Sequence, residues 1–126
     1  MDLTNKTIMI VDDSILARKQ LKDTINNYAP GATFVDAANG VEAAEQYKQH
    51  KPDLSFIDIV MPEKSGIEAI SEITAIDADA VLVVVSSIGT QEQLKKAIMA
   101  GAKDFVQKPL SPDHIYQIID SRLGGN

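Results

Sequence analysis

One carboxylate stands inside an otherwise apolar segment, Phe56-Ile57-Asp58-Ile59-Val60-Met61-Pro62. An unpaired carboxylate is costly to bury, so Asp58 must lie at the open end of a strand, be paired, or bind a cation. Pro62 cannot continue a sheet ladder, and the strand has therefore ended before it. We expect Asp58 near the carboxyl end of a strand, at the mouth of the fold, where a side chain can do chemistry.

Polar side chains also end three other apolar segments, and their types suit phosphoryl chemistry. They are Asp12 with Asp13, Ser86, and Lys108. Three clustered carboxylates repel one another, and a hard divalent cation removes that conflict. An oxygen-only ligand set without thiols favours magnesium or calcium over zinc, and a short, irregular set suits Mg²⁺. An ammonium and a hydroxyl nearby would neutralise a phosphoryl group, so Asp58 is expected to be a nucleophile that forms an aspartyl phosphate.

The segments that carry these residues alternate between strand and helix patterns. Apolar, β-branched runs predict five strands, at residues 7–11, 32–37, 54–58, 80–86 and 104–107. Apolar stripes with capping residues predict five helices, at about residues 15–28, 40–50, 66–76, 91–100 and 112–123. This alternation predicts an α/β fold, a doubly wound parallel sheet with helices on both faces, in which strand ends form the ligand crevice.

The patterns also predict positions within this fold. The second strand is short and less apolar, which suggests an edge; the fifth is expected at the other edge, and the very apolar fourth inside the sheet. Ser14 and Ser111 are expected to cap the first and last helices. The apolar faces of the helices, which we expect to be buried, include Val41, Ile76 and Ile98.

Composition and charge exclude several classes of protein. The 126 residues suffice for one domain, which we expect to span 1–126. A formal charge of -6 without a stripe of Lys or Arg argues against binding to nucleic acid or an anionic membrane. The absence of cysteine excludes disulfides, zinc-thiolate sites and cysteine nucleophiles. Neither a leader nor an apolar run of membrane-spanning length is present, so we expect a soluble, cytoplasmic protein.

Five short motifs occur in order along the chain: Val11-Asp12-Asp13-Ser14, Asp58-Ile59-Val60-Met61-Pro62 with Gly66, Val85-Ser86-Ser87, Ala100-Gly101-Ala102 and Lys108-Pro109-Leu110. Each motif alone is weak, but together they make the chain resemble a response-regulator receiver domain over its whole length. It is similar to the single-domain chemotaxis regulators. The resemblance implies a flavodoxin-like (βα)5 fold with strand order 2-1-3-4-5. It also implies two-component signal transduction without an output domain.

The resemblance implies a role for each acidic residue. Asp58 would accept a phosphoryl group from the phosphohistidine of a sensor histidine kinase. Mg²⁺ would be held by Asp13, Asp58 and the backbone carbonyl of Val60, with Asp12 acting mostly through water. In the family, Val60 and Ile88 flank the route of attacking water, and both side chains are apolar here. We therefore expect the protein to dephosphorylate itself slowly. A phosphatase partner or back-transfer to the kinase would then end the signal.

The resemblance also implies a switch. Lys108 would contact the phosphoryl group, and its bond to Pro109 would be cis. Ser86, rather than Ser87, would face the site, and phosphorylation would draw its hydroxyl inward. Phe105 would then follow into the vacated space and change a surface formed by the fourth helix, the fifth strand and the last helix, which binds a protein target.

Other interpretations remain open on the residues alone. Asp12 and Asp13 could simply form a turn and a helix cap, and Phe105 could be a core aromatic. A magnesium-dependent phosphatase also uses a strand-end Asp, Lys and Ser, although 126 residues leave no room for its cap. A nucleotide or flavin binder needs a glycine-rich loop where Asp12 and Asp13 stand. A phosphate-independent interaction module is the last alternative to the expected signalling module, which would not be a turnover enzyme.

Overall fold

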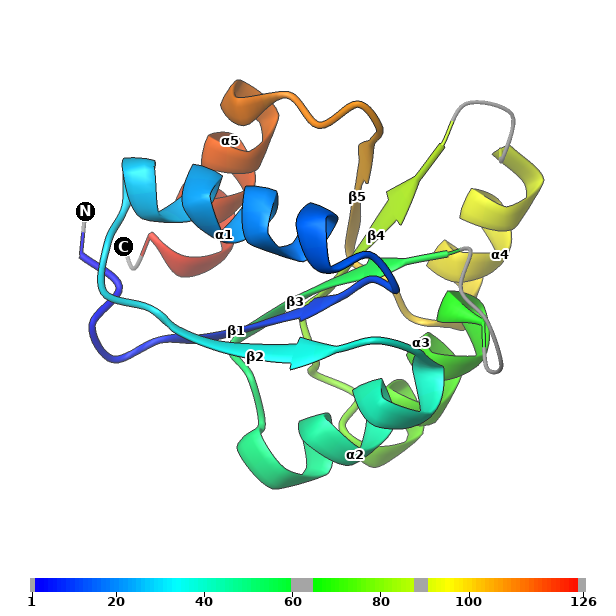
Figure 1. Cartoon of the computed structure of the whole chain (residues 1–126). Helices are drawn as coiled ribbons and strands as arrows, with labels where there is room; N and C mark the ends of the chain where they lie inside the picture. The colour runs from blue at the N-terminus through cyan, green and yellow to red at the C-terminus, as the bar shows by residue number, and fades with distance from the viewer. Residues whose placement is uncertain (1, 60–64, 88–90, 125–126) are drawn as a thin grey trace.

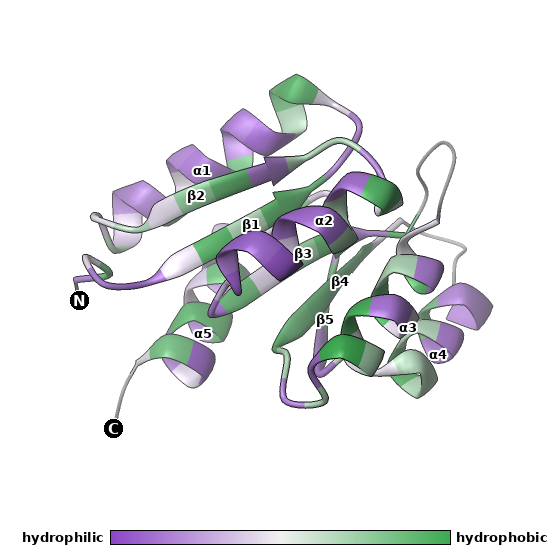
Figure 2. Cartoon of the chain, turned by 90° about the horizontal axis from the view of Figure 1, so that it is seen from below, coloured by the Kyte–Doolittle hydropathy of each residue, from purple (hydrophilic) through white to green (hydrophobic). Residues whose placement is uncertain are grey.

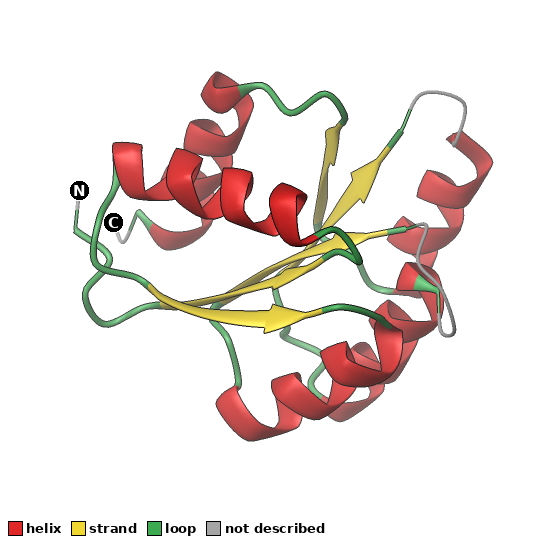
Figure 3. Ribbon diagram, in the orientation of Figure 1, coloured by secondary structure: helices red, strands yellow, loops and turns green. Residues whose placement is uncertain are grey.

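The computed structural model describes residues 2–59, 65–87 and 91–124. Its strands form one parallel sheet in the order β2-β1-β3-β4-β5 (Figure 1). The strands are β1 (Thr7–Val11), β2 (Thr33–Ala37), β3 (Leu54–Asp58), β4 (Leu82–Ser86) and β5 (Asp104–Gln107). The helices are α1 (Ile15–Tyr28), α2 (Gly40–His50), α3 (Gly66–Ile76), α4 (Gln91–Ala100) and α5 (Pro112–Leu123) (Figure 3). The predicted α/β class, the alternation of elements and the strand order are confirmed.

Alternate residues of the central strands enter two separate apolar layers. Met9 and Val11 of β1 pack with α2, α3 and α4, whereas Ile8 and Ile10 pack with α1 and α5. All residues of β3 and β4 are buried, because helices cover both faces of the sheet. Figure 2 shows these strands as a hydrophobic band between helices that carry both hydrophobic and hydrophilic residues. A rigid sheet thus holds the strand ends on which the site residues lie.

The edges and the middle of the sheet follow the pattern of apolar residues. β2 and β5 lie at the two edges, as predicted, and β4 lies inside the sheet between β3 and β5. β2 and β4 begin at Thr33 and Leu82, later than the predicted 32 and 80. None of the helices in the described part of the chain is long and apolar enough to cross a membrane.

Three predicted buried positions and one predicted cap are wrong. Val41, Ile76 and Ile98 are 41%, 45% and 43% exposed. All three are among the large apolar side chains that the fold leaves exposed. Ser14 caps α1 by accepting a hydrogen bond from a backbone N–H, but the Ser111 side chain makes no such bond at the start of α5. A proline at the first helical position presets the backbone there, so α5 begins without a side-chain cap.

Candidate metal and phosphoryl site

Three carboxylates converge at the carboxyl ends of two adjacent strands. β1 and β3 pair in parallel, with Val11 opposite Ile57, so the residues that follow them meet at one edge. Asp12, Asp13 and Asp58 each offer a carboxylate oxygen, and these oxygens lie within 4.8 Å of one another. Asp12 and Asp58 are 7% exposed, whereas Asp13 is open to solvent. The cluster is therefore accessible from one side and walled by the sheet on the other.

Lys108 lies against two of these carboxylates. Its Nζ donates to Oδ2 of Asp58 at 2.9 Å and to Oδ2 of Asp12 at 3.2 Å. Burial by itself would lower the pKa of Lys108, but the hydrogen bonds and charges of Asp58 and Asp12 outweigh it and raise this pKa. The ammonium therefore stays charged at neutral pH. Three carboxylates and one ammonium carry a formal charge of −2, which matches a divalent cation.

Backbone contacts bring Lys108 to this edge. Its N–H donates to the carbonyl of Ser86 at 2.7 Å, directly after the paired residues of β4 and β5. The peptide bond between Lys108 and Pro109 is cis, as predicted. Ser86 is 4% exposed, whereas Ser87 is exposed, so of the two hydroxyl residues it is Ser86 that the fold turns inward.

Phe105 lies outside the core in this structure. It is 42% exposed, and its ring meets that of His114 edge to face, with centroids 6.4 Å apart. A cavity of about 230 Å³ adjoins it, and Ser86 and Gln107 also line this space. The alternative that Phe105 is a core aromatic is therefore wrong for this conformation. Space for a side chain exists between the strand-end hydroxyl and the ring.

Gly66 determines how closely α3 approaches the acidic site. A Cβ placed on it would lie 2.1 Å from the backbone oxygen of Asp58, a distance that no real side chain tolerates. Its N–H donates to the carbonyl of Ile59 at 3.0 Å. Only glycine therefore allows the first turn of α3 to pack directly against the backbone of Asp58. Of the other residues predicted near the site, Val60 and Ile88 lie outside the described residues.

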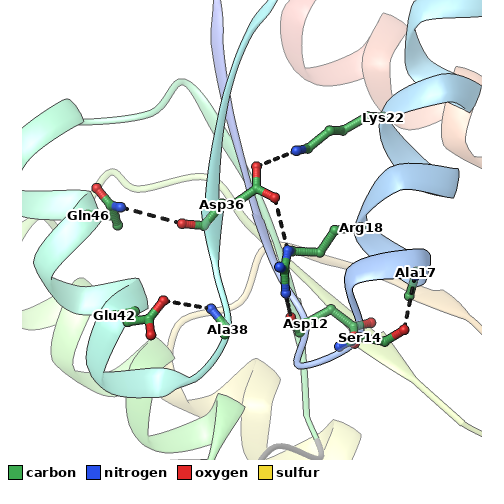
Figure 4. A network of polar contacts seen from close by, with 9 residues as sticks. All are labelled: Asp12, Ser14, Ala17, Arg18, Lys22, Asp36, Ala38, Glu42 and Gln46. Carbon is green, nitrogen blue, oxygen red and sulfur yellow. Dashed lines mark hydrogen bonds and ion pairs between the residues drawn. The ribbon is translucent and has the colours of Figure 1, made fainter.

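A polar network behind Asp12 was not predicted from the sequence (Figure 4). Arg18 of α1 donates to Asp36 of β2 and to the backbone oxygen of Asp12, and Lys22 pairs with Asp36 as well. The pattern of α1 placed Arg18 and Lys22 away from its apolar stripe. A signal was nevertheless present, because alternation in β2 puts Asp36 on the same face as Phe34, towards α1.

Comparisons with known proteins agree with this geometry. A family model described as the response regulator receiver domain matches residues 8–120, which include Asp12, Asp13, Asp58, Ser86 and Lys108. The chain is 44% identical over 115 residues to the chemotaxis protein CheY of Thermotoga maritima, covering 91% of this chain and 95% of that protein. Identity to CheY of Bacillus subtilis is 43% over 118 residues, covering 92% and 96%.

A solved structure extends the likeness to three dimensions. A chain of the CheX-CheY-BeF3-Mg complex from Borrelia burgdorferi is 34% identical to this chain and superposes with a TM-score of 0.83. The match covers 92% of this chain and 87% of that one. The likeness therefore extends over most of both chains.

Proposed function

Since this chain belongs to the family of response regulator receiver domains, we propose that Asp58 is the residue on which it accepts a phosphoryl group. The chain is a two-component signalling protein homologous to the CheY chemotaxis regulators. One observation carries the proposal. The carboxylates of Asp12, Asp13 and Asp58 offer oxygens within 4.8 Å of one another, and the ammonium of Lys108 lies 2.9 Å from Asp58.

The transfer makes one bond and breaks one bond. A carboxylate oxygen of Asp58 attacks the phosphorus of a phosphohistidine on the donor kinase, and the phosphorus–nitrogen bond breaks. The imidazole nitrogen leaves with the electron pair and takes up a proton. Lys108 neutralises charge on the phosphoryl oxygens, and the Ser86 hydroxyl donates a hydrogen bond to one of them. Ser86 ends β4, which pairs with β3, and Lys108 follows β5, the next strand of the sheet.

The acidic cluster fits a resident magnesium ion. Its donor set consists of carboxylate oxygens only, and its formal charge with Lys108 is −2. Asp13 and Asp58 would hold Mg²⁺ directly, Asp12 through water, and the carbonyl of Val60 is proposed as a further ligand. When bound, the cation would offset the charge of the carboxylates and of the phosphoryl oxygens. The carboxylates of this chain would in turn keep the ion beside Asp58.

The output is proposed to be a change in protein binding. Phosphorylation would draw Ser86 inward and Phe105 into the adjoining cavity, which alters the surface of α4, β5 and α5. Met99 of α4 is 80% exposed, and exposed apolar residues of this kind suit a protein target. The structure of a CheX-CheY complex supports partners of this general kind for a CheY relative.

The proposal includes the setting in which the chain works. A sensor histidine kinase would be the phosphodonor, a phosphatase could end the signal, and the whole exchange would take place in the cytoplasm. No turnover of an external substrate is expected. The CheY relatives, of which 95% and 96% are covered, support residues 1–126 as a single receiver domain.

Intact mass after incubation with acetyl phosphate and Mg²⁺ tests the proposal. We expect a gain of one phosphoryl group that Asp58→Asn and a chelator each abolish. Retention of the gain in Asp58→Asn would show that another residue accepts the group. Continued release of inorganic phosphate from p-nitrophenyl phosphate would favour an aspartate-based phosphatase, and a folded protein that gains nothing would favour a phosphate-independent interaction module.

A further inference from the structure

The side chain of Arg18 joins the acidic site to the edge strand. Its Nε donates to Oδ2 of Asp36 at 2.9 Å, and Nη1 donates to the backbone oxygen of Asp12 (Figure 4). The Arg18 side chain is only 13% exposed, so water competes little with these bonds. A guanidinium is a planar, rigid fork, and it therefore fixes its two acceptors relative to each other.

Asp12 is held from several directions at once. Its N–H donates to the carbonyl of Ala37 at 3.1 Å, and its carbonyl accepts from Arg18. Of its carboxylate oxygens, Oδ1 accepts from the N–H of Ser14 at 2.9 Å and Oδ2 from Lys108 at 3.2 Å. Both backbone groups of Asp12 are thus linked to β2. The N–H binds Ala37 directly, and the carbonyl is linked through Arg18 to Asp36, the residue before Ala37. One stretch of β2 therefore fixes the backbone of Asp12.

The carbonyl that Arg18 holds belongs to the peptide group between Asp12 and Asp13. The plane of this peptide sets the direction in which the chain enters Asp13. Asp13 is the exposed member of the cluster, and the wall of the sheet does not confine it as it confines Asp58. We propose that Arg18, anchored by Asp36, is a positioning residue that holds the Asp13 carboxylate in place for a divalent cation. This inference rests on the proposed function.

Charge alone predicts the opposite effect on metal affinity. A guanidinium close to three carboxylates repels an incoming cation, so its removal should tighten the binding of Mg²⁺ if Arg18 acted only through its field. Loss of a group that orients a ligand weakens binding instead. The sign of the change in the dissociation constant therefore separates the two roles of Arg18.

Calorimetric titration of the full chain with Mg²⁺, without a phosphodonor, measures this sign directly. We expect the dissociation constant to rise about tenfold in Arg18→Met and about threefold in Asp36→Asn. Arg18→Lys keeps the charge but lacks the fork, so it should also bind Mg²⁺ more weakly. The double variant Arg18→Met/Asp36→Asn should bind no more weakly than Arg18→Met, because both changes break one link.

The matched control is Lys22→Met. Lys22 pairs with Oδ1 of Asp36, whereas Arg18 binds Oδ2, so this variant removes a charge from the same network and keeps the link to Asp12. Its dissociation constant should stay within about twofold of that of the unmodified protein. Thermal unfolding of each variant shows whether it is folded, and Arg18→Lys, which keeps the charge, carries the test if Arg18→Met is not.

Unchanged or tighter binding of Mg²⁺ in the folded Arg18 and Asp36 variants would overturn the positioning role and leave the proposed function standing. An equal loss of affinity in Lys22→Met would overturn it too, because that variant keeps the link from Arg18 to Asp12, and loss of this link would then not explain the effect. If the unmodified protein binds no Mg²⁺, the inference and the metal part of the proposed function fall together.

Discussion

Lys108 has two opposing effects on the acidic site, because its ammonium contacts both Asp12 and Asp58. In the free protein it offsets the mutual repulsion of the carboxylates, but it also repels a divalent cation. In the proposed transfer reaction its charge would face the phosphoryl group. The raised pKa of Lys108 shows that the carboxylates stabilise its charged form more than burial disfavours it. One side chain is thus expected to trade metal affinity for stabilisation of the transferring group.

Replacing Lys108 should separate these two effects. In Lys108→Met we expect Mg²⁺ to bind more tightly, by about tenfold, because a competing charge is gone. Phosphorylation by acetyl phosphate at saturating Mg²⁺ should slow by about 100-fold, because a positively charged donor no longer faces the phosphoryl oxygens. Calorimetry and the rate of mass gain measure the two quantities. Weaker Mg²⁺ binding together with an unchanged rate would contradict this role, and Lys108→Arg controls for charge.

A second residue, Tyr47, should make the fold less stable at alkaline pH. Tyr47 is 3% exposed, and its hydroxyl donates to Oδ2 of Asp77 at 2.8 Å. Burial, followed by the hydrogen bond and charge of Asp77, raises the pKa of Tyr47 well above its ordinary 10.0. Folding therefore favours the protonated phenol. The corresponding stability is present below pH 10.0 and is lost as the pH rises above that value.

Denaturant unfolding over this pH range tests the effect. The free energy of unfolding should fall as the pH rises above 10.0, and the fall should be smaller in Tyr47→Phe. The pKa of Tyr28 is also raised, first by its hydrogen bond to Asp120. The pH dependence of unfolding is therefore measured in Tyr28→Phe as well, to separate the contributions of the two tyrosines. Tyrosinate absorbance of the folded protein gives an independent measurement. Ionisation of Tyr47 at the ordinary pKa of a tyrosine would contradict the prediction.

At the scale of elements, the first turn of α3 supports the site through close packing. Ser65 caps this helix in a reciprocal capping box with Glu68, which places Gly66 at the helix start. Gly66 then lies against the backbone of Asp58 without space for a side chain. The position of the proposed phosphoacceptor therefore depends on a helix that begins eight residues later in the chain.

Gly66→Ala should damage both stability and chemistry. A Cβ 2.1 Å from the Asp58 oxygen forces the helix and strand end apart. We expect the free energy of unfolding to fall by about 1–3 kcal/mol and phosphorylation by acetyl phosphate to slow. Ser71→Ala, at an exposed position of the same helix, should change stability by no more than about 0.5 kcal/mol. Equal stability and rates in the two variants would mean that the contact is unimportant.

The sequence was sufficient to predict the elements but not all of their contacts. Apolar runs that end in polar residues predicted the strands, and parallel pairing then required Asp12 and Asp58 to meet at one edge. The apolar stripes showed which face of each helix points to the sheet. They could not show how much of that face the neighbouring elements cover, so Ile98 was wrongly predicted to be buried. The bridge from Arg18 to Asp36 joins an edge strand to a helix, and local patterns do not reveal such pairings of long side chains.

At the scale of the whole molecule, the site and the proposed output surface lie along the same strands. Ser86 ends β4 beside the acidic edge, and Phe105 lies on the neighbouring strand β5, paired with Val84. A cavity of about 230 Å³ lies between the serine and the phenylalanine. We therefore propose that a small movement at the site is passed across these two strands to Phe105.

Phosphorylation should move the Phe105 ring away from His114. The chain has three phenylalanines, and Phe105 is the one that is exposed. In NMR spectra of protein labelled at phenylalanine rings, the contact between Phe105 and His114 should weaken after phosphorylation. Asp58→Asn with acetyl phosphate is the control and should keep the contact. A contact that persists in fully phosphorylated protein would contradict the switch.

Direct identification of the phosphorylated residue tests the central claim most directly. Borohydride reduces an aspartyl phosphate to homoserine, so the modified position can be read from peptide masses after digestion. Protein treated with acetyl phosphate and Mg²⁺ should carry homoserine at position 58, and untreated protein should carry none. Homoserine at another aspartate, or at none in protein that has gained a phosphoryl group, would contradict the assignment of Asp58.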